Sequence, residues 1–448
     1  MANRFDVAIL GAGPAGEHAA NALAREGRRV ALIEQELIGG ECSNWACIPT
    51  KTLLRPTELR GESERAAGVH KAALDWPALA RYRDYMTSAG DDSGRAEGYG
   101  ELGVTVLRGQ GRLAGRRRLE VAGDRLEAGS ILIATGSEAV IPPLDGLADA
   151  GYWTNREATA LEEIPRSAVV IGGGPVGIEL AQFLRRFGSE VALLQGADRL
   201  AQREHPRVSE LLAEHLRADG VDVRVGVQAK SVRRDGANRV VSLEGGGELH
   251  GERLIVAVGR RPRSSGIGLE TIGLDAAPRA VPIDQHCRVA DGVWAAGDCT
   301  GTMLFTHTAK YQARIAMSDM RGRPVPADYR AIPRVIFTDP EVAAVGLTEL
   351  QAREAGHDVA VARIELPGSI ARPYTYEQDP HGELSVIADR DRRVLLGAWA
   401  VAPLASEWIH QAGLAIRAEV KLEVLMDTVA QFPSFSEAYL SALQQLEL

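Results

Sequence analysis

Two segments of the chain share one pattern: a short apolar run ends in a glycine-rich turn and leads into an apolar repeat with helical spacing. They are residues 6–16, DVAILGAGPAG, and residues 168–177, AVVIGGGPVG. Their first glycines, Gly11 and Gly172, lie 172 − 11 = 161 positions apart, and the same offset relates Glu34 to Gln195, which follow the next apolar run in each half. The pattern therefore predicts two strand–turn–helix–strand units of one design.

Each turn has the form G-x-G-x-x-G between a predicted strand and a predicted helix, which is typical of a dinucleotide-binding unit. The first glycine permits the tight turn, the second lets the backbone approach a pyrophosphate, and the third lets the helix pack on the strand. The helix N-terminus then faces the anion. We therefore expect two dinucleotide sites, formed by Gly11, Gly13, Pro14, Ala15, Gly16 and Glu34 in the first half and by Gly172, Gly174, Gly177 and Gln195 in the second.

Other apolar runs predict further buried strands that end in small residues or an acid. They are residues 131–133 before Thr135 and Gly136, residues 254–258 before Gly259, and residues 293–296 before Gly297 and Asp298. From about residue 324, alternating positions at 383–388 and 394–402 predict antiparallel strands, and periodic runs at 406–417 and 437–446 predict helices. Residues 91–100 are interpreted as a polar, glycine-rich loop. The expected fold class is α/β, with two Rossmann-like dinucleotide-binding domains and a C-terminal α+β domain.

Composition narrows the function classes. The 448 residues carry a net charge of -9, which argues against a nucleic-acid partner, since phosphate binding needs a basic face. No uninterrupted apolar run of about 18 residues occurs, so no membrane span is expected. The N-terminus runs at once into a predicted strand, without a signal peptide. The expected compartment is the cytoplasm, where two closely spaced cysteines among only four point to redox or metal chemistry.

Cys42 and Cys47 are 47 − 42 = 5 positions apart. In an ideal helix this spacing separates the Cα atoms by about 8.6 Å, whereas a disulfide needs less than about 7 Å. A bridge therefore requires a distorted turn and would be easily reduced. Pro49 suits the first turn of a helix, which would place Cys47 at a helix N-terminus, where a thiolate is favoured. The alternatives are two unpaired core cysteines or a zinc site. Since the sequence has no second ligand pair with zinc-site spacing, no metal ligand is predicted.

The segment 39–51, GGECSNWACIPTK, resembles the redox-active segment of the pyridine nucleotide–disulfide oxidoreductases, the group of dihydrolipoamide dehydrogenase, glutathione reductase and mercuric reductase. The resemblance spans essentially the whole chain. It implies a homodimeric FAD enzyme that takes electrons from NADH or NADPH and passes them through Cys42 and Cys47 to a small-molecule acceptor. It also implies an FAD-binding domain at 1–148 and 265–323, an NAD(P)-binding domain at 149–264 and a dimerisation domain at 324–448.

The resemblance also implies roles for single residues. Cys47 would lie against the flavin, Cys42 would attack the acceptor, and Lys51 and Glu179 would form an ion pair beside the flavin, while Glu34 would bind the ribose hydroxyls. The remaining contacts with FAD would come from Gly11, Gly13, Pro14, Ala15, Gly16, Gly40, Lys51, Thr135, Gly136, Gly297, Asp298 and His307. Those with the nicotinamide nucleotide would come from Gly172, Gly174, Gly177, Gln195 and Gly259.

The chain departs from the family pattern near its C-terminus. The family has H-P-T-x-x-E, in which the histidine and glutamate act as an acid/base pair, whereas residues 431–437 here read QFPSFSE. Glu437 is retained as a catalytic candidate, but Phe432 replaces the histidine and cannot move a proton. Since acid/base help is worth about 10²–10⁴-fold, lipoamide and glutathione disulfide become doubtful substrates. Glu41 and Trp45, which flank Cys42, also depart from the pattern and imply an altered pocket.

Three points stay open. His307 or His410 could replace the missing histidine, although a structural role fits either better. Gln195 is neutral where NAD-specific relatives carry an acid, and Arg199 and Arg203 could reach a 2′-phosphate, so both nucleotides remain candidates. The acceptor is a disulfide or another small molecule. The alternatives are a quinone, dye or metal-ion reductase that does not need the dithiol, and, from another class, a redox-sensing disulfide switch.

Overall fold

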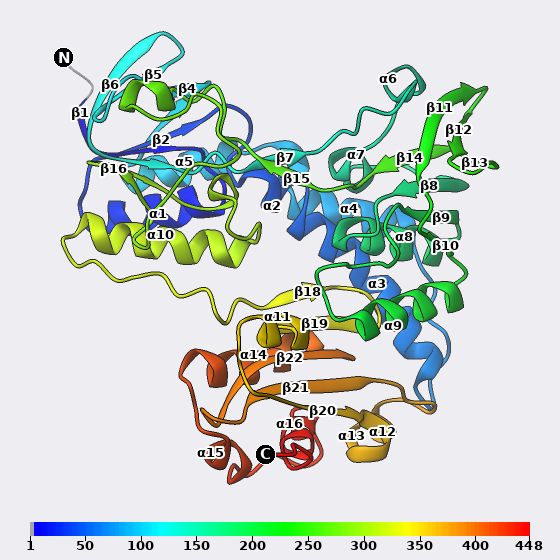
Figure 1. The fold of residues 1–448 in the computed structure, drawn as a ribbon. Coiled ribbons are helices and arrows are strands. Elements are labelled where there is room, and N and C mark those ends of the chain that lie inside the picture. Colours follow the sequence, from blue (N-terminus) through cyan, green and yellow to red (C-terminus); the bar gives the residue numbers. More distant parts are fainter. Residues whose placement is uncertain (1–3) are drawn as a thin grey trace. The chain divides into compact units, whose positions relative to one another are not determined.

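The structure is a computed structural model that describes residues 4–448 and divides into two compact units. Of the described residues, the first unit comprises 4–50, 80–140 and 259–327, and the second comprises 51–79, 141–258 and 328–448. Figure 1 labels their helices and strands. The boundaries at residues 50 and 79 fall inside α3 (Cys47–Arg65) and α4 (Trp76–Met86).

The first unit is built on a mainly parallel sheet in the order β16-β17-β6-β1-β2-β3, to which the hairpin strands β4 and β5 are joined through β6. Its strands are β1 (Arg4–Leu10), β2 (Val30–Glu34), β3 (Thr105–Arg108), β4 (Gly111–Leu113), β5 (Arg118–Val121), β6 (Asp124–Ile133), β16 (Arg288–Ala290) and β17 (Val293–Ala295). The strands β7 (Ser137–Ala139) and β15 (Arg260–Pro262) form a separate antiparallel pair. The sheet confirms the first predicted strand–turn–helix–strand unit.

Alternation along β1 explains why this sheet is buried on both faces. Val7 and Ile9 pack under α1 (Pro14–Arg25) and α10 (Thr306–Met320). Ala8 and Leu10 pack in a second core with the hairpin residues Leu113 and Leu119. A strand covered on both faces reads as a continuous apolar run, as residues 7–10 do.

The expectation of a loop at residues 91–100 was wrong. Residues Ser93–Glu101 form helix α5. Tyr99 is buried, accepts a hydrogen bond from Asn21 at 3.1 Å and donates one to Glu17 at 3.4 Å. The three glycines of this segment have weak helix propensity, and a Cβ added to any of them would have no atom within 4 Å. The packing of Tyr99 outweighs this weak propensity.

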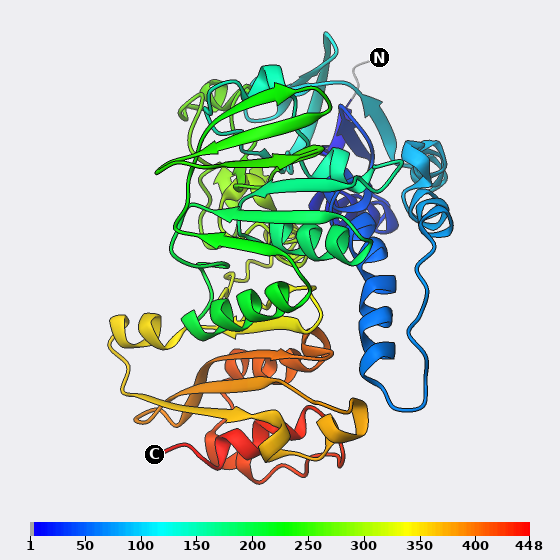
Figure 2. The ribbon, with the colours of Figure 1, turned by 90° about the vertical axis from the view of Figure 1, so that its right-hand side faces the viewer.

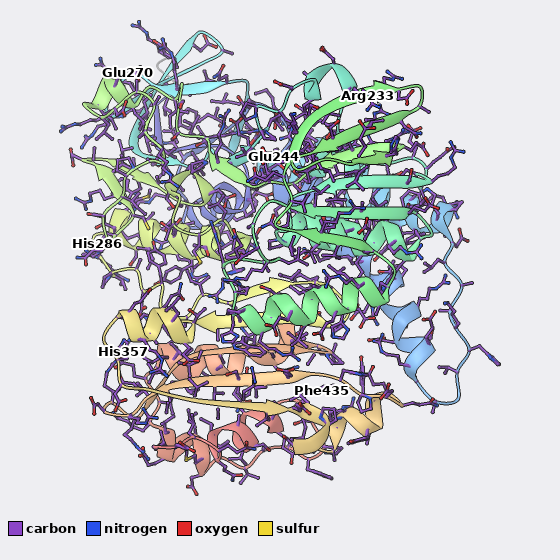
Figure 3. The ribbon with its side chains drawn as sticks, turned by 45° about the vertical axis from the view of Figure 1, so that its right-hand side comes forward. Arg233, Glu244, Glu270, His286, His357 and Phe435 are labelled. Carbon is purple, nitrogen blue, oxygen red and sulfur yellow. The ribbon has the colours of Figure 1, made fainter. Side chains whose placement is uncertain are left out.

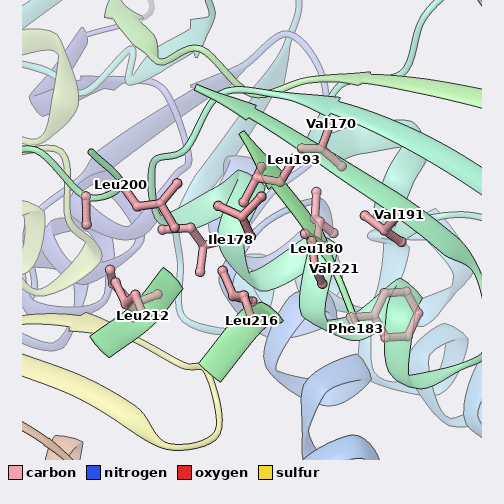
Figure 4. Packing of buried hydrophobic residues seen from close by; sticks show 14 of the residues in the cluster. Val170, Ile178, Leu180, Phe183, Val191, Leu193, Leu200, Leu212, Leu216 and Val221 are labelled. Carbon is pink, nitrogen blue, oxygen red and sulfur yellow. The ribbon is translucent and has the colours of Figure 1, made fainter. Parts of the chain in front are cut away.

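The second unit contains the repeat of the first design, a parallel sheet in the order β10-β9-β8-β14. The elements of this repeat are β8 (Ser167–Ile171), α8 (Pro175–Arg186), β9 (Glu190–Gln195), α9 (Pro206–Ala218), β10 (Asp222–Val225) and β14 (Arg253–Val256). A separate antiparallel sheet consists of β11 (Ala229–Asp235), β12 (Asn238–Leu243) and β13 (Glu248–Gly251). The unit also contains the short helices α6 (Leu147–Ala150) and α7 (Asn155–Thr159). Figure 4 shows the core beneath α8, where Ile178 and Phe183 pack among residues of the sheet and of α9.

The same unit ends in an antiparallel sheet in the order β18-β19-β22-β21-β20. Its elements are β18 (Arg334–Ile336), β19 (Glu341–Gly346), α11 (Glu349–Glu354), β20 (Val359–Glu365), α12 (Leu366–Ser369), α13 (Arg372–Tyr376), β21 (Glu383–Asp389), β22 (Val394–Ala402), α14 (Ala405–Arg417), α15 (Leu422–Met426) and α16 (Glu437–Leu443). The strands predicted at 383–388 and 394–402 and the helices at 406–417 and 437–446 are confirmed to within a few residues.

Both faces of this last sheet are covered. Trp399 and Val401 of β22 face the core that contains α8 and α9, and Figure 2 shows α9 between the parallel sheet and this antiparallel sheet. Ala398 and Ala400, on the other face, pack with α14 and α16. Phe435, labelled in Figure 3, belongs to this core and stacks on Trp408 of α14.

Among residues 4–448, no helix is both long enough and apolar enough to cross a membrane.

Candidate functional site

The first and third glycines of each turn are required by close backbone packing. Gly11 has a φ of +108°, and a Cβ there would lie 2.3 Å from the carbonyl oxygen of Ala134. A Cβ on Gly16 would lie 2.0 Å from the oxygen of Gly11. In the second unit, Gly172 has a φ of +119°, and a Cβ on Gly177 would lie 1.9 Å from the oxygen of Gly172. The two turns therefore share one backbone geometry.

The middle glycines are different, because protein packing does not explain them. Gly13 has a φ of -75° and Gly174 a φ of -87°, values that any residue adopts. A Cβ on Gly13 would meet no protein atom closer than 4.0 Å, and one on Gly174 would meet none within 4 Å. Both glycines cap a helix N-terminus, where an anion is favoured. The absent side chains leave room for a group from outside the chain, which fits a dinucleotide pyrophosphate at each turn.

An acceptor side chain follows each turn at the end of the next strand. Glu34 accepts hydrogen bonds from the backbone N–H of Ala12 at 2.7 Å and of Glu36 at 2.8 Å. At the equivalent place in the second unit, Gln195 accepts one from the N–H of Gly173 at 3.1 Å. These bonds hold both side chains at the strand end, where a ribose would lie.

Arg199, a candidate for a 2′-phosphate, is committed to its own loop. Its guanidinium donates to the carbonyl of Glu204 at 2.8 Å, to that of Gln202 at 2.7 Å and to the hydroxyl of Ser209 at 3.0 Å. Arg203 is exposed on the same loop. Arg199 is therefore the less available of the two cations for binding a phosphate.

The residues after β6 and β17 meet around Asp298. The hydroxyl of Ser137 donates to the Asp298 carboxylate at 2.6 Å, and Arg260 donates to that hydroxyl at 2.8 Å. Burial raises the pKa of Asp298, although the bond from Ser137 and the charge of Arg260 oppose this effect. The neighbouring Gly297 donates its N–H to Gln312 at 2.7 Å.

The other predicted glycines of this unit lie in tight turns. Thr135 donates its hydroxyl to the carbonyl of Arg263 at 2.6 Å, and Gly136 has a φ of +73°. Gly259, with a φ of +136°, accepts the N–H of Val140 at 2.9 Å. Gly40 lies so close to Gly13 that a Cβ on it would be 2.8 Å from the Gly13 Cα. The first turn and the start of α2 (Gly40–Asn44) therefore adjoin one another.

Cys42 and Cys47 lie on either side of a helix break, and Cys47 begins a helix, as the position of Pro49 predicted. Cys42 belongs to α2, which ends at Asn44, and Cys47 is the first residue of α3. Neither forms a disulfide in this structure, and both are partly buried. Contact with the Cys47 sulphur and burial raise the pKa of Cys42 well above its usual value, because two negative charges would lie side by side. The pair is therefore suited to hold one proton when reduced.

Lys51 and Glu179 form an ion pair within the second unit. The Lys51 ammonium donates to one Glu179 oxygen at 2.7 Å, and the other oxygen accepts the N–H of Phe337 at 2.9 Å. The ammonium also lies 4.7 Å from the centre of the Phe337 ring. Glu179 is buried, and these two hydrogen bonds hold its carboxylate in one position.

The C-terminal candidates show an acid without its expected partner. Phe432 keeps 64% of its surface exposed, and the peptide bond to Pro433 is cis. Glu437 begins α16, and its Oε2 atom is buried with no hydrogen-bond partner among the described residues. At these positions the chain therefore carries the glutamate of the family motif but not its histidine.

Several contacts were not predicted from the sequence. Thr306 lies 3.5 Å from the Cys47 sulphur, and Glu41 pairs with Arg260 at 3.4 Å. The position of Thr306 beside His307, which was singled out, was the one available signal. His307 is exposed and stacks on Phe305 at 5.1 Å between ring centres. Between residues 4 and 448, no three or more metal-ligating side chains gather into a cluster.

Comparison with known proteins identifies this arrangement. A family described as pyridine nucleotide-disulphide oxidoreductase matches residues 5–313, and the dimerisation domain of the same enzymes matches residues 332–443. The chain is 35% identical to a dihydrolipoyl dehydrogenase of Thermus scotoductus, covering 99% of this chain and 97% of the relative. It is 34% identical to a mercuric reductase of Streptomyces lividans, covering 98% and 96%.

Solved structures of similar proteins share the fold over the full length. A Cu(II) complex of a cysteine mutant of the HOCl-induced flavoprotein disulfide reductase RclA from Escherichia coli matches with a TM-score of 0.89 at 27% identity, covering 99% of each chain. LpdA from Mycobacterium tuberculosis matches with a TM-score of 0.88 at 29% identity, again covering 99% of each. Members of the family are FAD-dependent and use NAD(P)H as electron donor, and the paired glycine turns fit that use. The chain belongs to the pyridine nucleotide–disulphide oxidoreductases and is an enzyme of that family.

Proposed function

We propose that this enzyme passes electrons from NAD(P)H through Cys42 and Cys47 to a thiophilic metal ion, such as Hg(II) or Cu(II). The observation that supports it is the cysteine pair itself: two thiols in contact across a helix break, in the unit that carries the first glycine turn. Thiolates favour soft metal ions. A relative is named mercuric reductase, and a structural neighbour was solved with Cu(II).

Phe432 favours a metal ion over a disulfide as the acceptor. When a disulfide is reduced, the departing thiolate must be protonated, and an acid supplies this proton. The exposed phenyl ring of Phe432 cannot do so, and the buried oxygen of Glu437 has no hydrogen-bond partner within residues 4–448. A metal ion leaves no thiolate to protonate: two electrons convert one Hg(II) to Hg(0), or two Cu(II) to two Cu(I), and the metal displaces the proton from the thiol as it binds.

FAD would supply the two-electron chemistry that links a nicotinamide to a disulfide. We assign its ADP half to the turn of Gly11, Gly13 and Gly16 with Glu34, and its ribityl side to Asp298, whose carboxylate Ser137 orients. We assign the nicotinamide nucleotide to the turn of the second unit. Lys51 would hold positive charge beside the flavin because Glu179 fixes its ammonium.

We retain an FAD-binding domain at 1–148 and 265–323, an NAD(P)-binding domain at 149–264 and a dimerisation domain at 324–448. We also propose a homodimer. The C-terminal part matches the dimerisation domain of the family, and it exposes apolar side chains, with Leu414 at 69%, Val429 at 95% and Phe432 at 64%. A cytoplasmic location suits a cysteine pair that must be kept reducible.

Steady-state oxidation of NADH and NADPH by the FAD-loaded protein tests the acceptor. The acceptors are Hg(II), Cu(II), a quinone, lipoamide and glutathione disulfide, and each is tested with the wild type and with Cys42→Ser. Cys287→Ser is the matched control, because Cys287 is fully buried and apart from the pair.

We expect metal-ion reduction in the wild type and in Cys287→Ser, and its loss in Cys42→Ser. Metal-ion reduction that survives in Cys42→Ser would mean that the dithiol is not the exit for electrons. Strong turnover with lipoamide or glutathione disulfide would contradict the proposed acceptor and would point to a proton donor other than residue 432. Absence of turnover with every acceptor would favour the redox-switch alternative.

A further inference from the structure

Two side chains at the start of helix α5 bind the backbone that leads to Cys42. The backbone N–H of Ile38, just before α2, donates to the carboxylate of Asp92 at 2.6 Å. The carbonyl of Ile38 accepts a hydrogen bond from the guanidinium of Arg95 at 2.7 Å. Asp92 precedes α5 and Arg95 lies in its first turn, and all these residues belong to the first unit. We call Asp92 and Arg95 the α5 clasp.

The α5 clasp is anchored to the sheet and fits closely on the backbone. Arg108 of β3 donates two hydrogen bonds to Asp92, at 2.7 and 2.8 Å, and this carboxylate is only 13% exposed. Ile38 itself is fully buried in the core of the unit. Gly39 has a φ of +100°, and a Cβ there would lie 2.1 Å from a guanidinium nitrogen of Arg95. The segment before α2 is therefore held by its own burial and by the clasp.

The bound residue is also joined to the helix that carries Cys42. The side-chain amide of Asn44 donates to the carbonyl of Ile38 at 3.2 Å and to that of Gly40 at 2.9 Å. Asn44 is buried and is the last residue of α2. The carbonyl of Ile38 thus accepts hydrogen bonds from both α5 and α2, so that the position of α2 depends on the clasp.

We infer that Asp92 and Arg95 are positioning residues for the redox pair, because they fix α2 and so keep the sulphur of Cys42 beside that of its partner. The two sulphurs are in contact in this structure. Holding two reacting groups together in advance lowers the entropic cost of joining them, so the clasp favours the disulfide over the dithiol. The inference rests on the proposed role of Cys42 and Cys47 as the exit for electrons.

The test is the equilibrium of the pair with dithiothreitol in the anaerobic, FAD-loaded protein. One reduced dithiothreitol becomes its cyclic disulfide while the Cys42–Cys47 disulfide becomes two thiols, so two electrons and two protons are exchanged. After quenching with iodoacetamide, peptide mass spectrometry gives the reduced fraction of the pair at each ratio of reduced to oxidised dithiothreitol. The midpoint of this titration measures how strongly the protein favours the disulfide.

The variants separate the hydrogen bond from the charge. Arg95→Gln removes the guanidinium, whereas Arg95→Lys retains a cationic donor. The matched control is Arg117→Gln, which removes the same charge from an exposed arginine in the turn between β4 and β5 of the same unit.

We expect Arg95→Gln to shift the midpoint ratio about tenfold toward easier reduction, because one hydrogen bond from a charged donor is lost. For a two-electron couple this shift equals about 30 mV. Arg95→Lys should recover most of the shift, and Arg117→Gln should keep the wild-type midpoint. An unchanged midpoint in Arg95→Gln, or an equal shift in Arg117→Gln, would overturn the inference. If Arg95→Gln does not fold, Asp92→Ala compared with Arg117→Gln decides by the same criterion.

The outcome separates this inference from the proposed function. If the disulfide forms but its midpoint is independent of Arg95, the inference is wrong and the proposed function stands. If no disulfide between Cys42 and Cys47 forms at any ratio, the proposed function is wrong, and the inference falls with it.

Discussion

Asp339 is the buried centre of an ion network that joins three distant segments of the second unit. Arg65 donates to its carboxylate at 2.7 and 3.0 Å, and Arg186 donates at 2.8 Å. Gln182 brackets the same residue, accepting its N–H at 2.9 Å and donating to its carbonyl at 3.0 Å. A Cβ on Gly61 would lie 2.3 Å from the carboxylate, so α3 approaches as closely as it can. We predict that Asp339→Asn, which keeps the shape and removes the charge, strongly destabilises this unit.

The magnitude follows from burial. The side chains of Asp339 and Arg186 are 5% and 11% exposed, and that of Arg65 is 30% exposed. Breaking a buried pair costs about 3–5 kcal/mol because the remaining charge is left without its partner. Since Arg65 keeps its ion pair with Glu377 and Arg186 keeps its pair with Asp219, we expect the lower end, about 3 kcal/mol of unfolding free energy.

Urea unfolding of the wild type and of Asp339→Asn, followed by tryptophan fluorescence, measures the difference. The matched control is Glu349→Gln, which breaks the exposed pair of Glu349 with Arg353, 2.9 Å apart and 35% and 55% exposed. Exposed pairs contribute less than about 1 kcal/mol. A loss of stability in Asp339→Asn no larger than in Glu349→Gln would refute the reasoning.

The same pair of proteins tests a pH dependence. Burial would raise the pKa of Asp339, but the charges of Arg186 and Arg65 outweigh it and hold the pKa below its usual value. The charged carboxylate therefore contributes its full stability above the unfolded pKa of about 3.9, and this contribution is lost as the pH falls through the lower folded pKa. The stability difference between wild type and Asp339→Asn should be constant near neutral pH and shrink only in acid.

Three further predictions concern ligands. Gly13→Ala should leave the fold intact but weaken FAD binding at least about tenfold, roughly 1.4 kcal/mol, as measured by flavin fluorescence. Gly11→Ala should instead prevent folding, because its Cβ would lie 2.3 Å from a backbone oxygen. Normal FAD affinity in Gly13→Ala would contradict the assigned site. Gln195→Glu should lower kcat/KM for NADPH about tenfold and leave that for NADH nearly unchanged, since a carboxylate repels a 2′-phosphate. Arg203→Ala should also lower kcat/KM for NADPH. Equal effects on both nucleotides would contradict this prediction. Phe432→His should raise lipoamide or glutathione disulfide reduction at least about tenfold, within the range of acid/base catalysis, and no gain would show that more than this residue is missing.

The local chemistry could be predicted from the sequence, but the long-range contacts could not. The glycine turns and the helix N-terminus at Cys47 follow from patterns within a few residues, because local geometry determines them. The Asp339 network joins residues 65, 186 and 339, and no local period encodes such a contact. Arg199 could not be distinguished from Arg203 by sequence, since only the fold of their loop shows that Arg199 donates its hydrogen bonds to the carbonyls of that loop. Helix α5 was missed because one buried tyrosine outweighs its glycines.

The central claim is that electrons leave the enzyme through Cys42 and Cys47. Anaerobic addition of one equivalent of NADH to the oxidised holoprotein, followed by alkylation and peptide mass spectrometry, tests it most directly. We predict that both cysteines change from a disulfide to alkylatable thiols, while Cys287 and Cys299, which are fully buried, stay unchanged. Oxidation of the NADH without any new alkylation at Cys42 and Cys47 would contradict the account.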